Sequence, residues 1–286
     1  MSFDRLMWLV QPESGLDHWA WHVVGTGLDD PHDVLAADLN GDGRDEIIVR
    51  EKDGRLMIFQ VLSNPHDPWE RTVVAEFLKG DGTAVADLSG NGSLDIVTNM
   101  GWFENVKGDG SQWIHHPLIP DTLEWHPESR LVVGDVDGDG KLEVVITESE
   151  IGPARLAILR QIHVDKPWDA EIVLGSDLDL RALHSLQIAD LNGDGLLEIF
   201  TAEMENNKTD GVNSKPRWWC LAREGATWSS HVLLDANLGT HSAVIADYDG
   251  DGRLDIVGKL WRANAVNGNE GRLHVDCLWN RGSEYV

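Results

Sequence analysis

Five short acidic loops recur along this chain of 286 residues. Each loop has oxygen-bearing side chains at its first, third, fifth and ninth positions and glycine at its sixth. The first residues of successive loops are 49, 48, 55 and 57 positions apart. A recurrence at this period is typical of propellers and solenoids, in which every repeat is one supersecondary unit. The loops therefore restrict the chain to repeat architectures.

The spacing of the oxygen atoms predicts calcium. Alternate oxygen ligands, with glycine allowing a tight turn, are how a short peptide surrounds this ion. The predicted ligands are Asp38, Asn40, Asp42, Glu46, Asp87, Ser89, Asn91, Asp95, Asp135, Asp137, Asp139, Glu143, Asp190, Asn192, Asp194, Glu198, Asp247, Asp249, Asp251 and Asp255. The second loop has neutral Ser89 and Asn91, so we expect the weakest binding there. The alternative is that these residues form ordinary hairpin turns without an ion. The prediction is up to five structural calcium ions.

Short apolar runs on both sides of each loop predict two strands joined by a turn. A third strand follows in every repeat, and a fourth begins near a tryptophan in four of them. These tryptophans are Trp69, Trp113, Trp168 and Trp228. The fifth repeat lacks this fourth strand, but Trp19–Val24 resembles the missing segment.

The repeats predict an all-β, five-bladed β-propeller that forms a single domain over residues 1–286, with loops starting at 38, 87, 135, 190 and 247. The N-terminal strand Trp19–Val24 is expected to close the ring by completing the last blade, which removes exposed sheet edges. The alternative, a fragment of a larger ring, leaves this match unexplained.

A second set of residues occupies the position six residues before each loop. These residues are His32, Asp81, Ser129, His184 and His241. The inner strands of a propeller converge on its axis, so the three histidines and the aspartate are expected to meet and bind zinc, iron or manganese. His126 is a candidate to replace the ligand missing at Ser129. The alternative is that each histidine only forms local hydrogen bonds.

Loops between the second and third strands should open on the same face. Glu148 and Glu203 are candidate general bases, and with Asp81 they would serve a glycosidase. Arg50 and Lys259 would stabilise an anionic intermediate. Trp102 and Trp261 are candidate surfaces for stacking against a sugar, or else they pack the blades.

The net charge restricts the partners of the chain. Acidic residues outnumber basic ones 49 to 23, giving a formal charge of -26, which opposes binding to nucleic acid.

No apolar run is long enough for membrane insertion, and no signal peptide is visible. The chain is therefore expected in the cytoplasm, or in an extracellular or periplasmic space if its N-terminus is processed. The oligomeric state stays open. The two cysteines, Cys220 and Cys277, are expected as free thiols.

The segment Ala37-Asp38-Leu-Asn-Gly-Asp-Gly-Arg-Asp-Glu-Ile and its four relatives resemble FG-GAP/VCBS-type calcium-binding repeats. This resemblance covers nearly the whole chain and implies a β-propeller. Residues 183–190 and 239–247 look like inner strands of the propeller in aldos-2-ulose dehydratases, which are sugar lyases. That resemblance implies a carbohydrate or another small-molecule substrate.

Three functions follow from these observations. The first is a metal-dependent lyase or dehydratase that acts on a sugar or keto-sugar, with a cation polarising a carbonyl while histidine or glutamate moves the proton. The second is a non-catalytic calcium propeller that binds glycans or proteins. The third is a glycoside hydrolase. It is the weakest of the three, because three inward histidines have no role in that chemistry.

Overall fold

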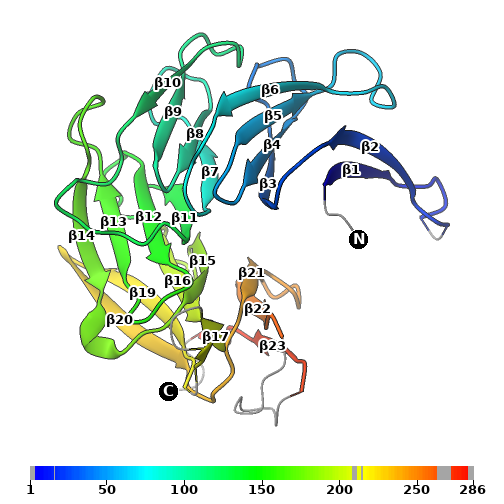
Figure 1. Cartoon of the computed structure of the whole chain (residues 1–286). Helices are drawn as coiled ribbons and strands as arrows, with labels where there is room; N and C mark the ends of the chain where they lie inside the picture. The colour runs from blue at the N-terminus through cyan, green and yellow to red at the C-terminus, as the bar shows by residue number, and fades with distance from the viewer. Residues whose placement is uncertain (1–3, 16, 208–210, 214, 263–271, 283–286) are drawn as a thin grey trace. The chain divides into compact units, whose positions relative to one another are not determined.

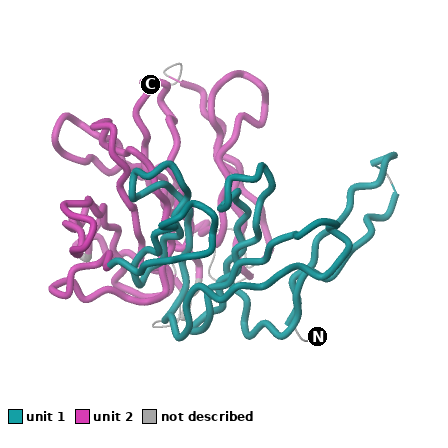
Figure 2. The backbone as a smooth tube through the Cα atoms, turned by 90° about the horizontal axis from the view of Figure 1, so that it is seen from above, with its two compact units in different colours: residues 1–116 teal, residues 117–286 magenta. Residues whose placement is uncertain are grey.

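The computed structural model describes residues 4–15, 17–207, 211–213, 215–262 and 272–282. The chain divides into two compact units, residues 1–116 and 117–286 (Figure 2). It is all-β and has the sheet order of a five-bladed β-propeller (Figure 1). In the described ranges, the one helix is a 3-10 turn at Ser176–Leu178. None of the described helices is long and apolar enough to cross a membrane.

Unit 1 contains two four-stranded blades and a hairpin. Its first blade has the order β3-β4-β5-β6 and its second the order β10-β9-β8-β7, so each strand pairs with its neighbour in sequence. The strands of these blades are β3 (Pro31–Ala37), β4 (Glu46–Glu51), β5 (Leu56–Gln60), β6 (Glu70–Ala75), β7 (Thr83–Ala86), β8 (Asp95–Thr98), β9 (Gly101–Asn105) and β10 (Trp113–His116).

Unit 2 contains the other three blades, with orders β11-β12-β13-β14, β15-β16-β19-β20 and β21-β22-β23. A short ribbon, β17 (Asn206–Asn207) and β18 (Gly211–Val212), interrupts the middle blade. The blade strands are β11 (Ser129–Gly134), β12 (Glu143–Glu148), β13 (Leu156–Arg160), β14 (Asp169–Leu174), β15 (Leu183–Ala189), β16 (Glu198–Glu203), β19 (Trp218–Glu224), β20 (Thr227–Leu234), β21 (Ser242–Ala246), β22 (Asp255–Lys259) and β23 (Val275–Leu278).

The second strand of each blade is the most deeply buried. All residues of β8, β12 and β16 are buried, as expected for a strand with a sheet neighbour on each side and a blade against its faces. Apolar side chains join successive blades. One cluster contains Ile48 and Leu56 of the first blade with Ile96 and Phe103 of the second. Apolar burial between blades therefore stabilises each unit.

The segment predicted to complete the last blade has a different partner. β2 (Ala20–Thr26) pairs with β1 (Arg5–Val10) in a two-stranded sheet. One face of this hairpin packs on the first blade, where Val24 and Trp8 join a cluster with Met57 and Phe59. Among the described strands, the last blade has three. The sequence did not predict β1, which offers β2 a partner across a short connection at a small entropic cost.

Candidate functional site

The acidic loops connect the first and second strands of every blade. In the first loop, the Asp38 carboxylate accepts backbone hydrogen bonds from Gly41 and Gly43, both at 2.8 Å. The same pair of contacts recurs in the third, fourth and fifth loops. Gly43 has a φ of 83°, a left-handed conformation that favours glycine. These contacts fold each of the four loops around its first aspartate.

The ninth loop position is buried in every repeat. Glu46 is 4% exposed, and its carboxylate accepts the backbone N–H of Leu39 at 2.9 Å. Asp95 and Asp255 each also accept a backbone N–H from the third strand or from a residue shortly after it, at 2.9 and 2.8 Å. Burial raises the pKa of Glu46, Asp95 and Glu198. This carboxylate fastens the loop to the sheet, a role that the sequence did not reveal.

Two loops gather three carboxylates each. In the described part of the chain, groups of three or more histidine, cysteine or carboxylate side chains with ligand atoms within 4.8 Å of one another occur at Asp135, Asp137 and Glu143 and at Asp247, Asp249 and Asp251. Burial, followed by the charge of Asp137, raises the pKa of Glu143 to about 7. Oxygen-rich groups of this kind suit calcium. Their donor atoms therefore fit the predicted ion, while Arg160 and Arg223 also contact Asp137 at 3.1 and 3.2 Å.

The histidine set predicted to bind a central metal is divided between the units. In unit 1, His32 Nε2 lies 3.2 Å from the Asp81 carboxylate, and its Nδ1 lies 3.0 Å from Asp33. Lys52 Nζ lies 3.5 Å from Asp81, which is fully buried. These contacts form a charged network in which Asp81 already faces a cationic side chain.

In unit 2, the rings of His184 and His241 stack with their centroids 3.9 Å apart. His184 Nδ1 donates a hydrogen bond to the His241 carbonyl oxygen at 2.7 Å, and Arg130 donates one to His184 Nε2 at 2.8 Å. An arginine can only donate, so this hydrogen bond uses the Nε2 lone pair, and the Glu150 carboxylate lies 3.4 Å from the same nitrogen. Its lone pair is therefore used by Arg130 and not presented to a metal. The sequence predicted the two histidines together but missed Arg130.

His241 has a different environment from His184. Burial, then the nearby His184, lowers the pKa of His241 to about 3, with Arg130 and Lys259 contributing. Its Nδ1 is buried and accepts no hydrogen bond from the described residues. The ring of Trp261 is nearly parallel to it, with centroids 6.2 Å apart. His241 thus offers a neutral imidazole beside cationic groups, which favours an anionic or hydroxyl-bearing neighbour over a metal ion.

Glu148 and Glu203 each belong to a recurring ion pair. Glu148 is 1% exposed, binds Arg155 through both oxygens at 2.9 and 2.6 Å, and accepts the backbone N–H of His126 at 3.2 Å. Glu203 binds Arg217 at 2.9 Å and accepts the Arg181 backbone N–H.

Unit 1 repeats this arrangement with Glu51, Arg55 and the Asp29 backbone. We call each of these glutamate–arginine pairs a blade staple. In the sequence, a blade staple is indicated by a glutamate at the end of the second strand and an arginine just before the third. The staples hold Glu148 and Glu203 in structural contacts, so their predicted role as bases gains no support.

Three further candidates lie in structural positions. His126 Nδ1 accepts the Glu128 backbone N–H at 3.2 Å, so this ring fixes a turn. Arg50 is fully buried and donates to the backbone oxygens of Glu51, Lys79 and Gly80. Lys259 lies at the end of β22, opposite Ser242.

The two tryptophans predicted to stack on a sugar differ in exposure. Trp102 is fully buried in β9 and stacks on His116, with centroids 4.4 Å apart. We therefore correct the prediction that Trp102 stacks on a sugar, because its ring has no exposed face. Trp261 is 52% exposed, although Arg262 covers part of its ring at 4.3 Å. Only this second ring is available to a ligand.

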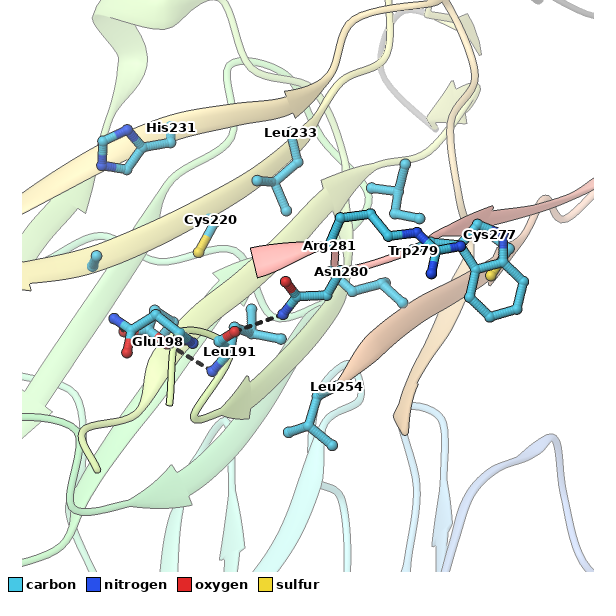
Figure 3. Close-up of a pocket in the computed structure, with 14 residues that line it drawn as sticks. Leu191, Glu198, Cys220, His231, Leu233, Leu254, Cys277, Trp279, Asn280 and Arg281 are labelled. Atoms are coloured by element: carbon cyan, nitrogen blue, oxygen red, sulfur yellow. Dashed lines mark hydrogen bonds between the residues drawn. The ribbon is translucent and has the colours of Figure 1, made fainter. Parts of the chain in front are cut away.

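A cavity of about 600 Å³ lies in unit 2 between the last two blades (Figure 3). Leucine side chains from both blades form much of its wall, and the free thiols of Cys220 and Cys277 also line it. Burial raises the pKa of Cys220 to about 11, so this thiol stays protonated. Asn280 at the edge donates to the Leu191 carbonyl at 2.7 Å. The cavity offers apolar packing rather than chemistry.

Residues 38–98 and 190–258 match the model of the FG-GAP-like repeat. The chain carries FG-GAP-like repeats. The matched ranges include the first, second, fourth and fifth acidic loops, while the third loop, at 135–143, lies between them. The structure shows that this third loop has the same pair of glycine hydrogen bonds as the first, fourth and fifth loops. No curated protein matches the chain.

Two solved structures are similar to this chain with FG-GAP-like repeats. One is the Tc holotoxin pore of Photorhabdus luminescens, with 15% identity and a TM-score of 0.40, covering 90% of this chain and 12% of that one. The other is a calcium structure of a Trichoderma reesei carbohydrate-active enzyme of family AA12, with 13% identity and a TM-score of 0.43. It covers 97% of this chain and 68% of that one. Similarity at this level carries no argument about activity.

Proposed function

We propose that this chain is a calcium-stabilised β-propeller that binds its ligand without transforming it. The observation that supports the proposal is that the candidate catalytic groups already form ion pairs and hydrogen bonds within the fold. Glu148 and Glu203 are held in blade staples, and the His184 lone pair accepts a hydrogen bond from Arg130. A general base or a metal ligand needs a lone pair that faces the substrate or the ion. These groups instead fix the loops around a binding surface.

Calcium is the cofactor in this proposal. Asp135, Asp137 and Glu143 would hold one ion, and Asp247, Asp249 and Asp251 would hold another, because their oxygen atoms already converge. Calcium would supply the positive charge that offsets the repulsion between these carboxylates. The ligand class that we propose is carbohydrate, on the resemblance of residues 183–190 and 239–247 to propeller strands of sugar lyases. A glycan or a protein would each be a consistent partner for a non-catalytic propeller.

Calcium binding is tested by calorimetry and thermal unfolding of the chelator-treated protein. Calcium at about 100 times its dissociation constant should add about 2.7 kcal/mol per independent site. Asp135→Asn should remove one equivalent of binding and part of the rise in melting temperature. Asp109→Asn is the control, because Asp109 caps an ordinary turn through the Ser111 backbone. Equal calcium responses in both variants, or none in the original chain, would refute the proposal.

A metal-dependent sugar lyase is the second candidate, and one observation favours it. His241 is a neutral imidazole whose Nδ1 accepts no hydrogen bond from the described residues, and Arg130 and Lys259 are near enough to lower its pKa. These groups would stabilise an anionic intermediate. We expect no turnover of keto-sugars by the calcium-loaded protein after zinc, iron or manganese is added. Turnover that disappears in His241→Ala would establish the lyase instead.

A further inference from the structure

Two histidines of unit 1 lie side by side and belong neither to the acidic loops nor to the predicted central histidine set. His22 Nε2 and His66 Nδ1 are 3.0 Å apart, and both side chains are accessible to solvent. His22 belongs to β2 of the hairpin, whereas His66 lies in the loop between β5 and β6 of the first blade. The pair therefore connects the hairpin to the blade on which it packs.

Each histidine is held in place by its surroundings. His22 is directly opposite Trp8 in the hairpin, and their rings stack with centroids 5.3 Å apart. The His66 backbone N–H donates to Asn64 Oδ1 at 3.1 Å, and Trp69 Nε1 donates to the Pro65 carbonyl at 3.1 Å. These contacts shape the loop and hold the two nitrogens next to each other.

The separation of the two nitrogens suits a shared transition-metal ion. Zinc binds imidazole nitrogen at about 2.0–2.1 Å with tetrahedral geometry, which places two ligand nitrogens about 3.3 Å apart. The observed 3.0 Å is shorter, and the rings pack edge to face with centroids 4.3 Å apart, so both rings must turn and separate to point their nitrogens at one ion. Imidazole favours zinc, copper and nickel, whereas calcium takes oxygen ligands. The pair is thus chemically distinct from the acidic loops, and water can complete the coordination at this exposed position.

We propose that His22 and His66 form a zinc site that clamps the N-terminal hairpin to the first blade. The ion would replace a single hydrogen bond between the rings with two coordinate bonds. Its binding would stabilise the arrangement of β2 against the loop that carries His66. This site does not depend on the proposed function of the propeller or on the candidate site at His184 and His241.

The test is a zinc titration by calorimetry of the protein kept in millimolar calcium, so that the acidic loops are occupied. We expect a zinc-binding event that is lost in both His22→Ala and His66→Ala. His163→Ala should retain it, because His163 lies in the equivalent loop of another blade, where its ring accepts the Asp165 backbone N–H. Zinc should also raise the melting temperature of the original chain and of His163→Ala.

The zinc titration and the melting temperature can each refute the proposal. If His22→Ala folds poorly because a strand residue is lost, His66→Ala in the exposed loop still decides the result. An original chain that binds no zinc overturns the proposal, since the pair is then a hydrogen bond alone. Zinc binding that persists in His66→Ala and disappears in His241→Ala also overturns it, and would place the ion at the site in unit 2.

Discussion

At the scale of single residues, crowded carboxylates are the main electrostatic feature of this chain. Glu143 is 3% exposed and lies close to two other acidic side chains of its loop. Its pKa of about 7 means that the folded protein holds a proton which the unfolded chain releases near pH 4.5. Without calcium, the folded state thus binds more protons than the unfolded state, and stability falls as the pH rises from about 4.5 through about 7.

Glu143→Gln should remove this loss of stability. In calcium-free buffer above pH 7, we expect the variant to be more stable than the original chain by about 1–2 kcal/mol, after allowance for solvent screening. Urea unfolding across a pH series measures the difference. Calcium should reverse the order, because the variant lacks one anionic ligand. Glu70→Gln, on an exposed position of β6, serves as the control and should follow the original chain at every pH.

At the scale of elements, the blade staples recur from one blade to another, as the acidic loops do. Each one joins a buried glutamate at the end of the second strand to an arginine that precedes the third, and to the backbone before the first. Arg155 also packs over the Trp125 ring at 4.9 Å. A staple therefore fixes three segments of one blade with a single ion pair.

Arg155→Met should destabilise unit 2 by about 3–5 kcal/mol, because it leaves the buried Glu148 carboxylate without its cation. The double variant Arg155→Met with Glu148→Met should recover much of this loss. Chemical unfolding of the two variants gives the comparison. Arg71→Met is the control, since the Arg71 guanidinium makes a long 3.4 Å hydrogen bond to the Thr26 carbonyl and no other among the described residues, and should change stability by less than about 0.5 kcal/mol. A small effect in Arg155→Met would mean that water replaces the arginine.

The sequence predicted elements well where the repeat itself carried the signal. The loops, the first three strands of each blade and the proximity of His184 and His241 all follow from positions counted along the repeat. β1 carries no repeat signal, so its pairing with β2 was not foreseen. Trp102 was expected at a loop mouth but belongs to β9, where it is buried. Arg130 and the arginines of the staples were missed because a long side chain reaches partners that spacing does not indicate.

At the scale of the whole molecule, a chain with a formal charge of -26 carries much of its acidity in five repeated loops. The central metal, the single domain and the carbohydrate ligand remain predictions at this scale. The zinc pair and the calcium loops are proposed within single units and can be tested separately. Their effects on stability should add, because sites that share no partner residues usually contribute additively.

The order of strands within the blades also has a kinetic consequence. In every blade, each described strand pairs with the next blade strand along the chain, and in the fourth blade the β17–β18 ribbon is inserted between two partners. Such pairings have low contact order, which favours fast formation because few residues must be ordered before a contact is made. One blade can be assembled while the residues of the next are still being synthesised. Folding is therefore expected to advance blade by blade from the amino terminus.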